Sequence, residues 1–332
     1  MGIIDQGVLT RVLSKKFNTD IVSADYSDER LDGGTLGDVR LVTGTATDIN
    51  GKSIPYKVVF KTQRQWERYG DPGSWRREYD FYSSGFGSLF TDTLRWPECY
   101  HAELNNDEHS MWMEYIEGVT GLNMTREMYE RAALELGRFQ GRLYAEQPVV
   151  LKSLTNLSAL GYMKSFYQHY RSWNVVYDYI RADDCAIPKH LCDMLIETDA
   201  NADSIFSRIE KLPVVLCHRD FWVTNIFCAD DKIVLLDWDT AGWGYMGEDI
   251  ASLIADEANV SYMTELYEKC VPAYYKGFSE YADVSHIKDH CVREMILCYY
   301  GYRLVGWYLN AETPEGKELQ IETLQKIRDF GF

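Results

Sequence analysis

The first third of the chain alternates apolar and polar residues as β-strands do. Residues 39–48 are rich in Val, Leu and Thr, and residues 54–61 are rich in Val, Ile and aromatic residues, which are all typical of strands. Between them stand Asn50 and Gly51, two residue types that tolerate positive φ and are typical of a tight hairpin turn. The pattern therefore predicts an antiparallel hairpin in a mostly β-stranded region.

A helix and one further strand complete this predicted region. An Asp-Pro-Gly turn at residues 71–73 precedes residues 75–83, for which we expect a helix. Residues 109–116 form an apolar strand that runs into a Glu-Gly pair. We therefore expect a small β-rich N-terminal lobe over residues 1–116.

The pattern turns helical beyond residue 120. Residues 125–145 carry apolar side chains at helical spacing, with Thr125 as a candidate N-cap. Residues 155–210 and the end of the chain also favour helices, and residues 214–239 form a short β island between them. We expect a larger, mainly helical lobe over residues 117–332 that contains a β-hairpin, which makes the fold class α+β.

Composition removes several classes of protein. The 332 residues are 46% hydrophobic and 26% charged, which is a globular composition. The formal net charge is −17, and binding to nucleic acid needs the opposite sign, so no nucleic-acid partner is expected. An acidic field attracts cations instead. No run reaches the ~20 apolar residues that span a bilayer, so no membrane partner is expected.

The cysteines and the N-terminus bear on location. None of the eight cysteines forms a C-x-x-C pair, so a zinc ribbon or a thioredoxin-type site is disfavoured. The N-terminal residues lack the basic-then-apolar layout of a secretion signal. Scattered thiols without such a signal fit a reducing compartment, and we expect a cytoplasmic protein.

The β island holds the residues that indicate chemistry. A buried apolar strand leads into His218-x-Asp220, and Asn225 follows five residues later. Two apolar runs around a polar turn then return the chain, so Asp237 is expected beside Asn225. Amide and carboxylate oxygens suit Mg²⁺, and a carboxylate that is not bound to the metal can accept a proton. Phosphoryl transfer needs these groups, although an Asx-rich turn with a purely structural role is the alternative.

These segments resemble the catalytic core of the aminoglycoside phosphotransferase and choline kinase superfamily, which shares its fold with protein kinases. Val-Leu-Cys-His-Arg-Asp-Phe-Trp-Val-Thr-Asn at residues 215–225 resembles the catalytic loop of that group, and Leu-Leu-Asp-Trp-Asp at residues 235–239 resembles its metal-binding strand. Gly-Glu-Asp-Ile-Ala at residues 247–251 is similar to the helix start that follows. The resemblance implies a bilobal, protein-kinase-like fold.

The resemblance also implies roles for single residues. It makes Asp220 the catalytic base and makes Asn225 and Asp237 the Mg²⁺ ligands. His218 would support the loop, and Asp249 would cap its helix and brace the loop. All five roles are expectations that depend on the family match.

The N-terminal lobe offers a second point of likeness. Residues 32–39, Asp-Gly-Gly-Thr-Leu-Gly-Asp-Val, resemble the glycine loop of kinases, with Gly34 and Gly37 as its second and third glycines. Asp32 stands where the first glycine is expected. A tight β-turn explains these glycines about as well, so the match gains weight only from the strand that follows.

That strand and its neighbours supply the other nucleotide-binding candidates. Lys61 matches the lysine that reaches the α- and β-phosphates, and Lys57, on the same strand face, is the alternative. Glu78 is expected to pair with Lys61, the alternative being an ordinary surface glutamate. By position in the family, backbone groups of Glu114 and Ile116 would contact the nucleotide base.

The acceptor is expected to be a small molecule. Only a short stretch separates Asp237 from the helix near Asp249, and no Ala-Pro-Glu follows, so a segment that docks polypeptides is lacking. Glu248, Asp256 and Glu257 are candidate ligands for a polycation such as an aminoglycoside. Solvated helix charges are the alternative explanation of these acids.

An aromatic helix near the C-terminus suggests a different acceptor. Aromatic faces bind quaternary ammonium groups, which would suit choline, although such a stripe is more often ordinary core. The aromatic residues are Tyr299, Tyr300, Tyr302, Trp307 and Tyr308. A choline, ethanolamine or other metabolite kinase is therefore the first alternative, and a nucleotide-binding pseudokinase scaffold is the non-enzymatic one.

Together the sequence predicts a Mg²⁺-dependent kinase of small molecules. Its donor would be ATP or GTP, and the γ-phosphoryl group would pass to a hydroxyl of an aminoglycoside-like or other cationic compound. If the acceptor is an antibiotic, we expect such an activity to confer antibiotic resistance.

Overall fold

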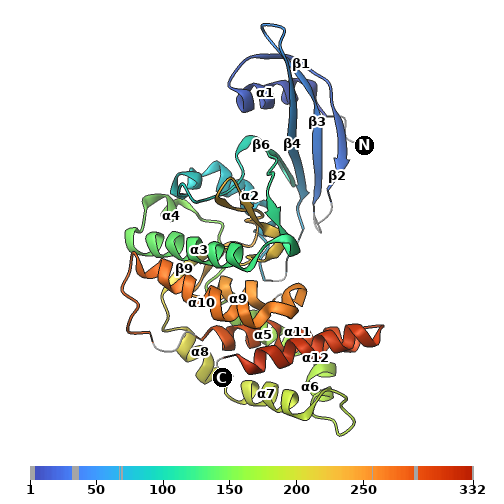
Figure 1. Cartoon of the computed structure of the whole chain (residues 1–332), viewed down its shortest axis with the longest axis vertical. Helices are drawn as coiled ribbons and strands as arrows, with labels where there is room; N and C mark the ends of the chain where they lie inside the picture. Colours follow the sequence, from blue (N-terminus) through green and yellow to red (C-terminus); the bar gives the residue numbers. More distant parts are fainter. Residues whose placement is uncertain are drawn as a thin grey trace. The chain divides into compact units, whose positions relative to one another are not determined.

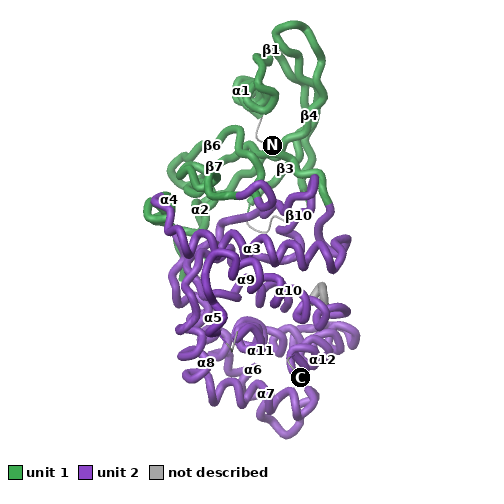
Figure 2. Tube along the Cα trace, turned by 60° about the vertical axis from the view of Figure 1, so that its left-hand side comes forward, with its two compact units in different colours: residues 1–90, 95–118, 150–156 green, residues 91–94, 119–149, 157–332 purple. Residues whose placement is uncertain are grey.

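The structure is a computed structural model that describes residues 4–31, 37–66, 68, 70–255, 257–287 and 291–330, with only the backbone described at 257–259. The chain divides into two compact units (Figure 2). Unit 1 comprises Met1–Phe90, Arg95–Gly118 and Val150–Asn156, and unit 2 comprises Thr91–Leu94, Val119–Val149 and Leu157–Phe332.

Unit 1 is built on an antiparallel sheet in the order β1-β3-β4-β7-β6, with β2 also paired to β3. Its strands are β1 (Ile21–Ala24), β2 (Ser27–Arg30), β3 (Asp38–Asp48), β4 (Ser53–Arg64), β6 (Cys99–Asn105) and β7 (Glu108–Glu114). The long β3–β4 hairpin is prominent in Figure 1. Its turn contains Gly51 at φ +80°, which confirms the predicted Asn-Gly turn, and its register sets Val39 opposite Lys61.

Helix α1 (Gln6–Phe17) was not expected from the strand pattern of this region. Its apolar residues Leu9, Val12 and Leu13 lie three and four positions apart, so they share one helical face. That face is buried in a core with strand residues such as Val42 and Val58. Helix α1 thus covers part of the sheet, although the sequence pattern alone did not predict this helix.

Helix α2 (Ser74–Ser83) follows the sheet's central hairpin and confirms the helix predicted at residues 75–83. Two short elements complete unit 1, the 3-10 helix η1 (Phe86–Leu89) and most of α4 (Val149–Ser153). The segment around α4 follows a long helix of unit 2 in the sequence, yet it belongs to unit 1. Its residues therefore support α2.

Unit 2 is mainly helical. Its α-helices include α3 (Arg126–Glu146), α5 (Tyr162–Arg171), α6 (Asn174–Tyr179), α7 (Lys189–Ala200), α8 (Ala202–Ile209), α9 (Glu248–Ala255), α10 (Met263–Ser279), α11 (Val292–Asn310) and α12 (Pro314–Asp329). Its 3-10 helices are η2 (Gly121–Asn123), η3 (Val223–Asn225) and η4 (Glu257–Tyr262).

Helix α3 confirms the helix predicted at residues 125–145. The Thr125 hydroxyl accepts the Met128 N–H at 3.3 Å and so caps the helix, as expected. The helix packs closely on α10, because a Cβ at Gly137 would lie only 2.1 Å from the Tyr274 carbonyl oxygen. Only glycine permits this approach of the two backbones.

Two small sheets sit among these helices. One has the order β5-β11-β10-β8, with β5 (Leu94–Arg95), β8 (Val119–Thr120), β10 (Ile226–Ala229) and β11 (Lys232–Leu235), and the other pairs β9 (Val214–Cys217) with β12 (Gly242–Tyr245). The predicted hairpin of the β island is therefore present, and the α+β class is confirmed. Within the described part of the chain, no helix combines the length and the apolar character needed to cross a bilayer.

Candidate active site

The open end of the β10–β11 hairpin brings Asn225 and Asp237 together. Antiparallel pairing sets Ile226 opposite Leu235, and the Leu236 N–H donates to the Asn225 carbonyl at 2.9 Å. Asp237 has a left-handed backbone conformation with φ +62°. The two residues therefore flank the mouth of the hairpin although twelve positions separate them, as the strand pattern predicted.

Asn225 also holds Asp220. Its Nδ2 donates to the Asp220 Oδ2 at 2.7 Å and to the Asp220 carbonyl at 3.1 Å. The loop folds back in this way because the Trp222 N–H also donates to the Asp220 carbonyl, at 3.1 Å. The Asn225 Oδ1 accepts no hydrogen bond from the described residues, so it remains available as an oxygen ligand.

The donor atoms at the hairpin mouth fit a magnesium ion. Mg²⁺ commonly takes one or two protein oxygens and completes its shell with water and phosphate oxygens. Asn225 Oδ1 and the Asp237 carboxylate are donors of this kind. Over the described residues, no group of three or more His, Cys, Asp and Glu side chains is placed to hold a metal ion.

Asp249, near the start of α9, holds the predicted catalytic loop in place. Its buried carboxylate accepts the His218 N–H at 2.9 Å and the Arg219 N–H at 2.7 Å. Gln140 Nε2 donates to the same carboxylate at 2.8 Å. Burial raises the pKa of Asp249, and these N–H donors act in the opposite direction. The brace expected from the family resemblance is thus present.

His218 supports the loop and is not suited to act as the base. Its Nδ1 accepts the Asp220 N–H at 3.3 Å, and its ring lies 4.5 Å from the buried Trp238 ring. Burial lowers the pKa of His218 to about 4, while the nearby Asp237 acts to raise it. The imidazole is therefore neutral at pH 7, as a packed structural side chain would be.

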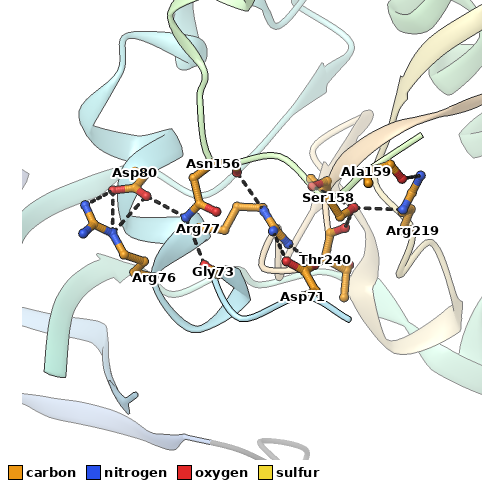
Figure 3. Close-up of polar contacts among 11 residues, drawn as sticks. Asp71, Gly73, Arg76, Arg77, Asp80, Asn156, Ser158, Ala159, Arg219 and Thr240 are labelled. Carbon is orange, nitrogen blue, oxygen red and sulfur yellow. Dashed lines mark hydrogen bonds and ion pairs between the residues drawn. The ribbon is translucent and has the colours of Figure 1, made fainter. Parts of the chain in front are cut away.

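Arg219 ties the loop to the chain segment that leads into α5 (Figure 3). Its Nη1 donates to the Ser158 hydroxyl at 2.9 Å, and its Nη2 donates to the carbonyls of Ala159 (3.0 Å) and Trp243. Its guanidinium lies 4.8 Å from the centre of the Tyr162 ring. Since Arg219 has a left-handed φ of +65°, these contacts hold a residue next to Asp220 in an uncommon conformation.

In unit 1, Lys61 and Glu78 form the expected ion pair. The Lys61 Nζ lies 2.5 Å from the Glu78 Oε2, and the side chains are 13% and 3% exposed. Lys57, the alternative lysine, is half-exposed and pairs with the exposed Glu117 at 2.6 Å. A buried, oriented ammonium is better suited to a fixed ligand than an exposed one, so the geometry favours Lys61.

The glycine loop is only partly within the described structure. Gly34 lies outside the described residues. Gly37 lies against β4, and a Cβ there would come within 2.6 Å of the Thr62 carbonyl oxygen. Gly37 thus allows the chain to pass close to the strand that carries Lys61, and its contact with nucleotide stays a prediction.

The two backbone positions predicted to contact the base differ in their hydrogen bonds. The Glu114 N–H donates to the Glu98 carbonyl at 2.8 Å, and the Glu114 carboxylate accepts two bonds from Arg95, at 2.6 and 2.9 Å. Ile116 is buried, and its N–H has no backbone acceptor among the described residues. The Ile116 N–H is therefore the donor that remains for a ligand, and both base contacts remain predictions.

Of the three acids predicted to bind the substrate, only Glu248 has a side chain within the described structure. Glu248 is 3% exposed, and its carboxylate already accepts the Tyr245 N–H at 2.7 Å and the Tyr299 hydroxyl at 3.1 Å. Burial raises the pKa of Glu248. Asp256 and the side chain of Glu257 lie outside the described residues. Among these acids, no described carboxylate is exposed for a polycation.

The predicted aromatic stripe of α11 divides into two groups. Tyr302 and Tyr308 are buried, as core residues are. Tyr299, Tyr300 and Trp307 are partly exposed. A cation does lie over part of this surface, but it belongs to the protein, because the guanidinium of Arg303 is 5.0 Å from the Tyr300 ring centre and 4.8 Å from that of Trp307.

Two supporting residues were not identified from the sequence. Gln140, in α3, links the Leu216 carbonyl (2.9 Å) and Asp249, and it accepts the Tyr274 hydroxyl at 2.5 Å. A polar residue among the apolar positions of the predicted helix was the signal that could have revealed it. Arg77, 1% exposed and bonded through two nitrogens to Asp71 (2.8 and 2.5 Å), supports α2 (Figure 3) and had no such signal.

Comparison with solved structures identifies the fold. A choline kinase from Cryptosporidium parvum is 14% identical, covers 92% of this chain and 89% of its own, and gives a TM-score of 0.56. The aminoglycoside phosphotransferase APH(4)-Ia, in a ternary complex with ADP and hygromycin B, is 14% identical, with coverage of 98% and 99% and a TM-score of 0.54. The amicoumacin kinase hAmiN is 13% identical, with coverage of 91% and 88% and a TM-score of 0.53. The expected protein-kinase-like fold is confirmed.

Sequence comparison gives the family. No curated protein sequence matches this chain. The model of the Phosphotransferase enzyme family matches residues 88–285, which is more than half of the 332 residues and includes the catalytic loop, the hairpin and the brace. With the site geometry and the fold described above, this match shows that the chain belongs to the Phosphotransferase enzyme family.

Proposed function

We propose that this protein transfers the γ-phosphoryl group of Mg²⁺-bound ATP or GTP to a hydroxyl group of a small molecule. The observation that carries the proposal is the hairpin mouth, where Asn225 holds Asp220 and lies beside Asp237. A carboxylate with two neighbouring oxygen donors is the arrangement that phosphoryl transfer requires.

In the proposed reaction the acceptor oxygen forms a bond to the γ-phosphorus while the bond to the β,γ-bridging oxygen breaks. The nucleoside diphosphate leaves, and the hydroxyl proton passes to an Asp220 oxygen. Asn225 Nδ2 orients that carboxylate by its 2.7 Å bond to Oδ2. Positioning and electrostatic stabilisation would supply most of the rate, and the base ~10²–10⁴-fold.

The residues proposed for the nucleotide follow the same logic. Asn225 Oδ1 and the Asp237 carboxylate would hold Mg²⁺, which when bound neutralises charge on the phosphates. Lys61, oriented by Glu78 at 2.5 Å, would contact the α- and β-phosphates. Gly37 and the Ile116 N–H would contact the phosphates and the base, respectively.

The test replaces the base without changing its shape. Asp220→Asn should lower Mg²⁺-dependent nucleotide hydrolysis, and transfer to any active acceptor, by ~10²–10⁴-fold. Binding of a fluorescent nucleotide should stay within about threefold of wild type, since the proposed metal ligands remain. Labelled ATP and GTP would be offered with aminoglycosides, choline, ethanolamine and homoserine as acceptors.

The matched control is Asp231→Asn, in the exposed turn of the same hairpin. It should retain wild-type turnover because its side chain is solvated. Wild-type turnover in Asp220→Asn would refute the proposal. If the wild-type chain binds nucleotide but neither hydrolyses it nor transfers phosphate to any acceptor, the scaffold alternative would be favoured.

A further inference from the structure

An aromatic surface in unit 2 begins next to the catalytic loop. Its six members, here called the aromatic wall, come from α5 and α11, which pack on each other (Figure 1). They are Tyr162, Phe166, Tyr170, Tyr299, Tyr300 and Trp307, and all six are partly exposed. Contiguous apolar surface that solvent reaches is a common feature of ligand-binding sites.

The wall is continuous with the catalytic loop through ring contacts. Arg219, the neighbour of Asp220, lies 4.8 Å from the Tyr162 ring centre. Tyr162 stacks on Phe166 with the centroids 5.6 Å apart, and Phe166 lies 5.8 Å from Tyr299. A small molecule on this wall would therefore lie on the side of the loop to which Arg219 points.

One cation sits in the middle of the wall. The Arg303 guanidinium lies 4.8–5.4 Å from four ring centres, those of Phe166, Tyr170, Tyr300 and Trp307. Arg303 is partly exposed, and its guanidinium makes no hydrogen bond or ion pair with another described residue. Its N–H donors are thus not satisfied by the part of the protein that is described.

This arrangement selects the charge of a ligand. A guanidinium that stacks on rings keeps its in-plane N–H donors directed outward, where they match both oxygens of a carboxylate. A second cation near the same rings would be repelled by the Arg303 guanidinium. Glu248, which accepts a hydrogen bond from the wall residue Tyr299, is buried.

We infer that the acceptor of this kinase is an anionic hydroxyl compound, with a planar apolar body that packs on the aromatic wall and a carboxylate that pairs with Arg303. The inference rests on the proposed function and makes it more specific. It differs from the cationic acceptor that the acidic composition favours, because a local cation outweighs a distant excess of charge screened by solvent.

The test uses two probes that differ in one charged group, 3-(hydroxymethyl)benzoate and 3-(hydroxymethyl)benzylamine. Binding to the full chain is measured by calorimetry without nucleotide, so that the result does not depend on catalysis. The benzoate should bind at least about tenfold more tightly than the amine. Arg303→Glu should reverse this preference, and Arg303→Lys should keep a weaker preference for the benzoate because lysine lacks the planar fork.

Arg126→Ala is the matched control, since Arg126 also stacks on a ring, that of Tyr262, but lies in α3 outside the wall. It should leave both affinities unchanged. Equal or tighter binding of the amine, binding of neither probe, or an Arg303→Lys variant that is folded by circular dichroism yet indifferent to the carboxylate would each overturn the inference. Selective benzoate binding by a chain that never transfers phosphate would refute the proposed function alone.

Discussion

Asp249→Asn tests the brace beneath the catalytic loop. In the wild type, three buried N–H donors converge on one carboxylate, from the backbones of His218 (2.9 Å) and Arg219 (2.7 Å) and from Gln140 (2.8 Å). An amide keeps one oxygen and turns the other acceptor into a donor. At least one buried N–H then faces another N–H, although the shape of the side chain is conserved.

The magnitude follows from these contacts. A buried donor without an acceptor costs about 1–3 kcal/mol, and the new amide N–H is itself such a donor. We therefore expect the free energy of unfolding to fall by about 2–4 kcal/mol. Because Arg219 is held at φ +65°, we also expect the loop to relax and displace Asp220, with a loss of ~10²-fold in nucleotide hydrolysis.

The assay is urea unfolding with tryptophan fluorescence as the readout. Buried Trp238 lies against the His218 ring and therefore reports on this region. The control is Glu127→Gln, which also replaces an acid in the first turn of a helix, but one whose side chain is 74% exposed. It should change stability by less than about 1 kcal/mol. If Asp249→Asn were as stable as this control, the proposed brace would be wrong.

Two further predictions concern the ion pair and the buried histidines. Lys61→Met should weaken nucleotide binding about tenfold and remove this partner from the buried Glu78 carboxylate. Lys57→Met changes an exposed pair and should leave nucleotide binding normal. Equal effects of the two variants in a fluorescent-nucleotide titration would contradict the assignment. Burial lowers the pKa of both His109 and His218 to about 4, below the usual ~6.5, so the unfolded chain binds more protons between these values. Stability should therefore fall by up to about 3 kcal/mol per histidine as the pH drops from 6.5 to 4, and urea midpoints that do not change over that range would contradict the burial argument.

Local sequence determined much of the catalytic hairpin. Two apolar runs around a polar turn can pair in only one way that returns the chain to its start, so Asp237 had to arrive near Asn225. The same local logic gave the Asn50-Gly51 turn and the Thr125 cap, because each depends on residues within a few positions. Lys61 and Glu78 were found as a pair because the family resemblance supplied the long-range contact.

Tertiary structure decided what each isolated acid or aromatic residue does. The sequence suggests that Glu248 is an exposed charge on a helix, yet packing buries it against Tyr299. Sequence alone could not show this, because burial depends on distant elements and not on residue type. In the sequence, Arg303 is a basic residue in an apolar helix, and nothing near it in the chain indicates a role. The folded structure places Phe166 and Tyr170 of α5 beside its guanidinium. Charge composition predicts the average field of a chain, but only the folded contacts fix the charge that a ligand meets.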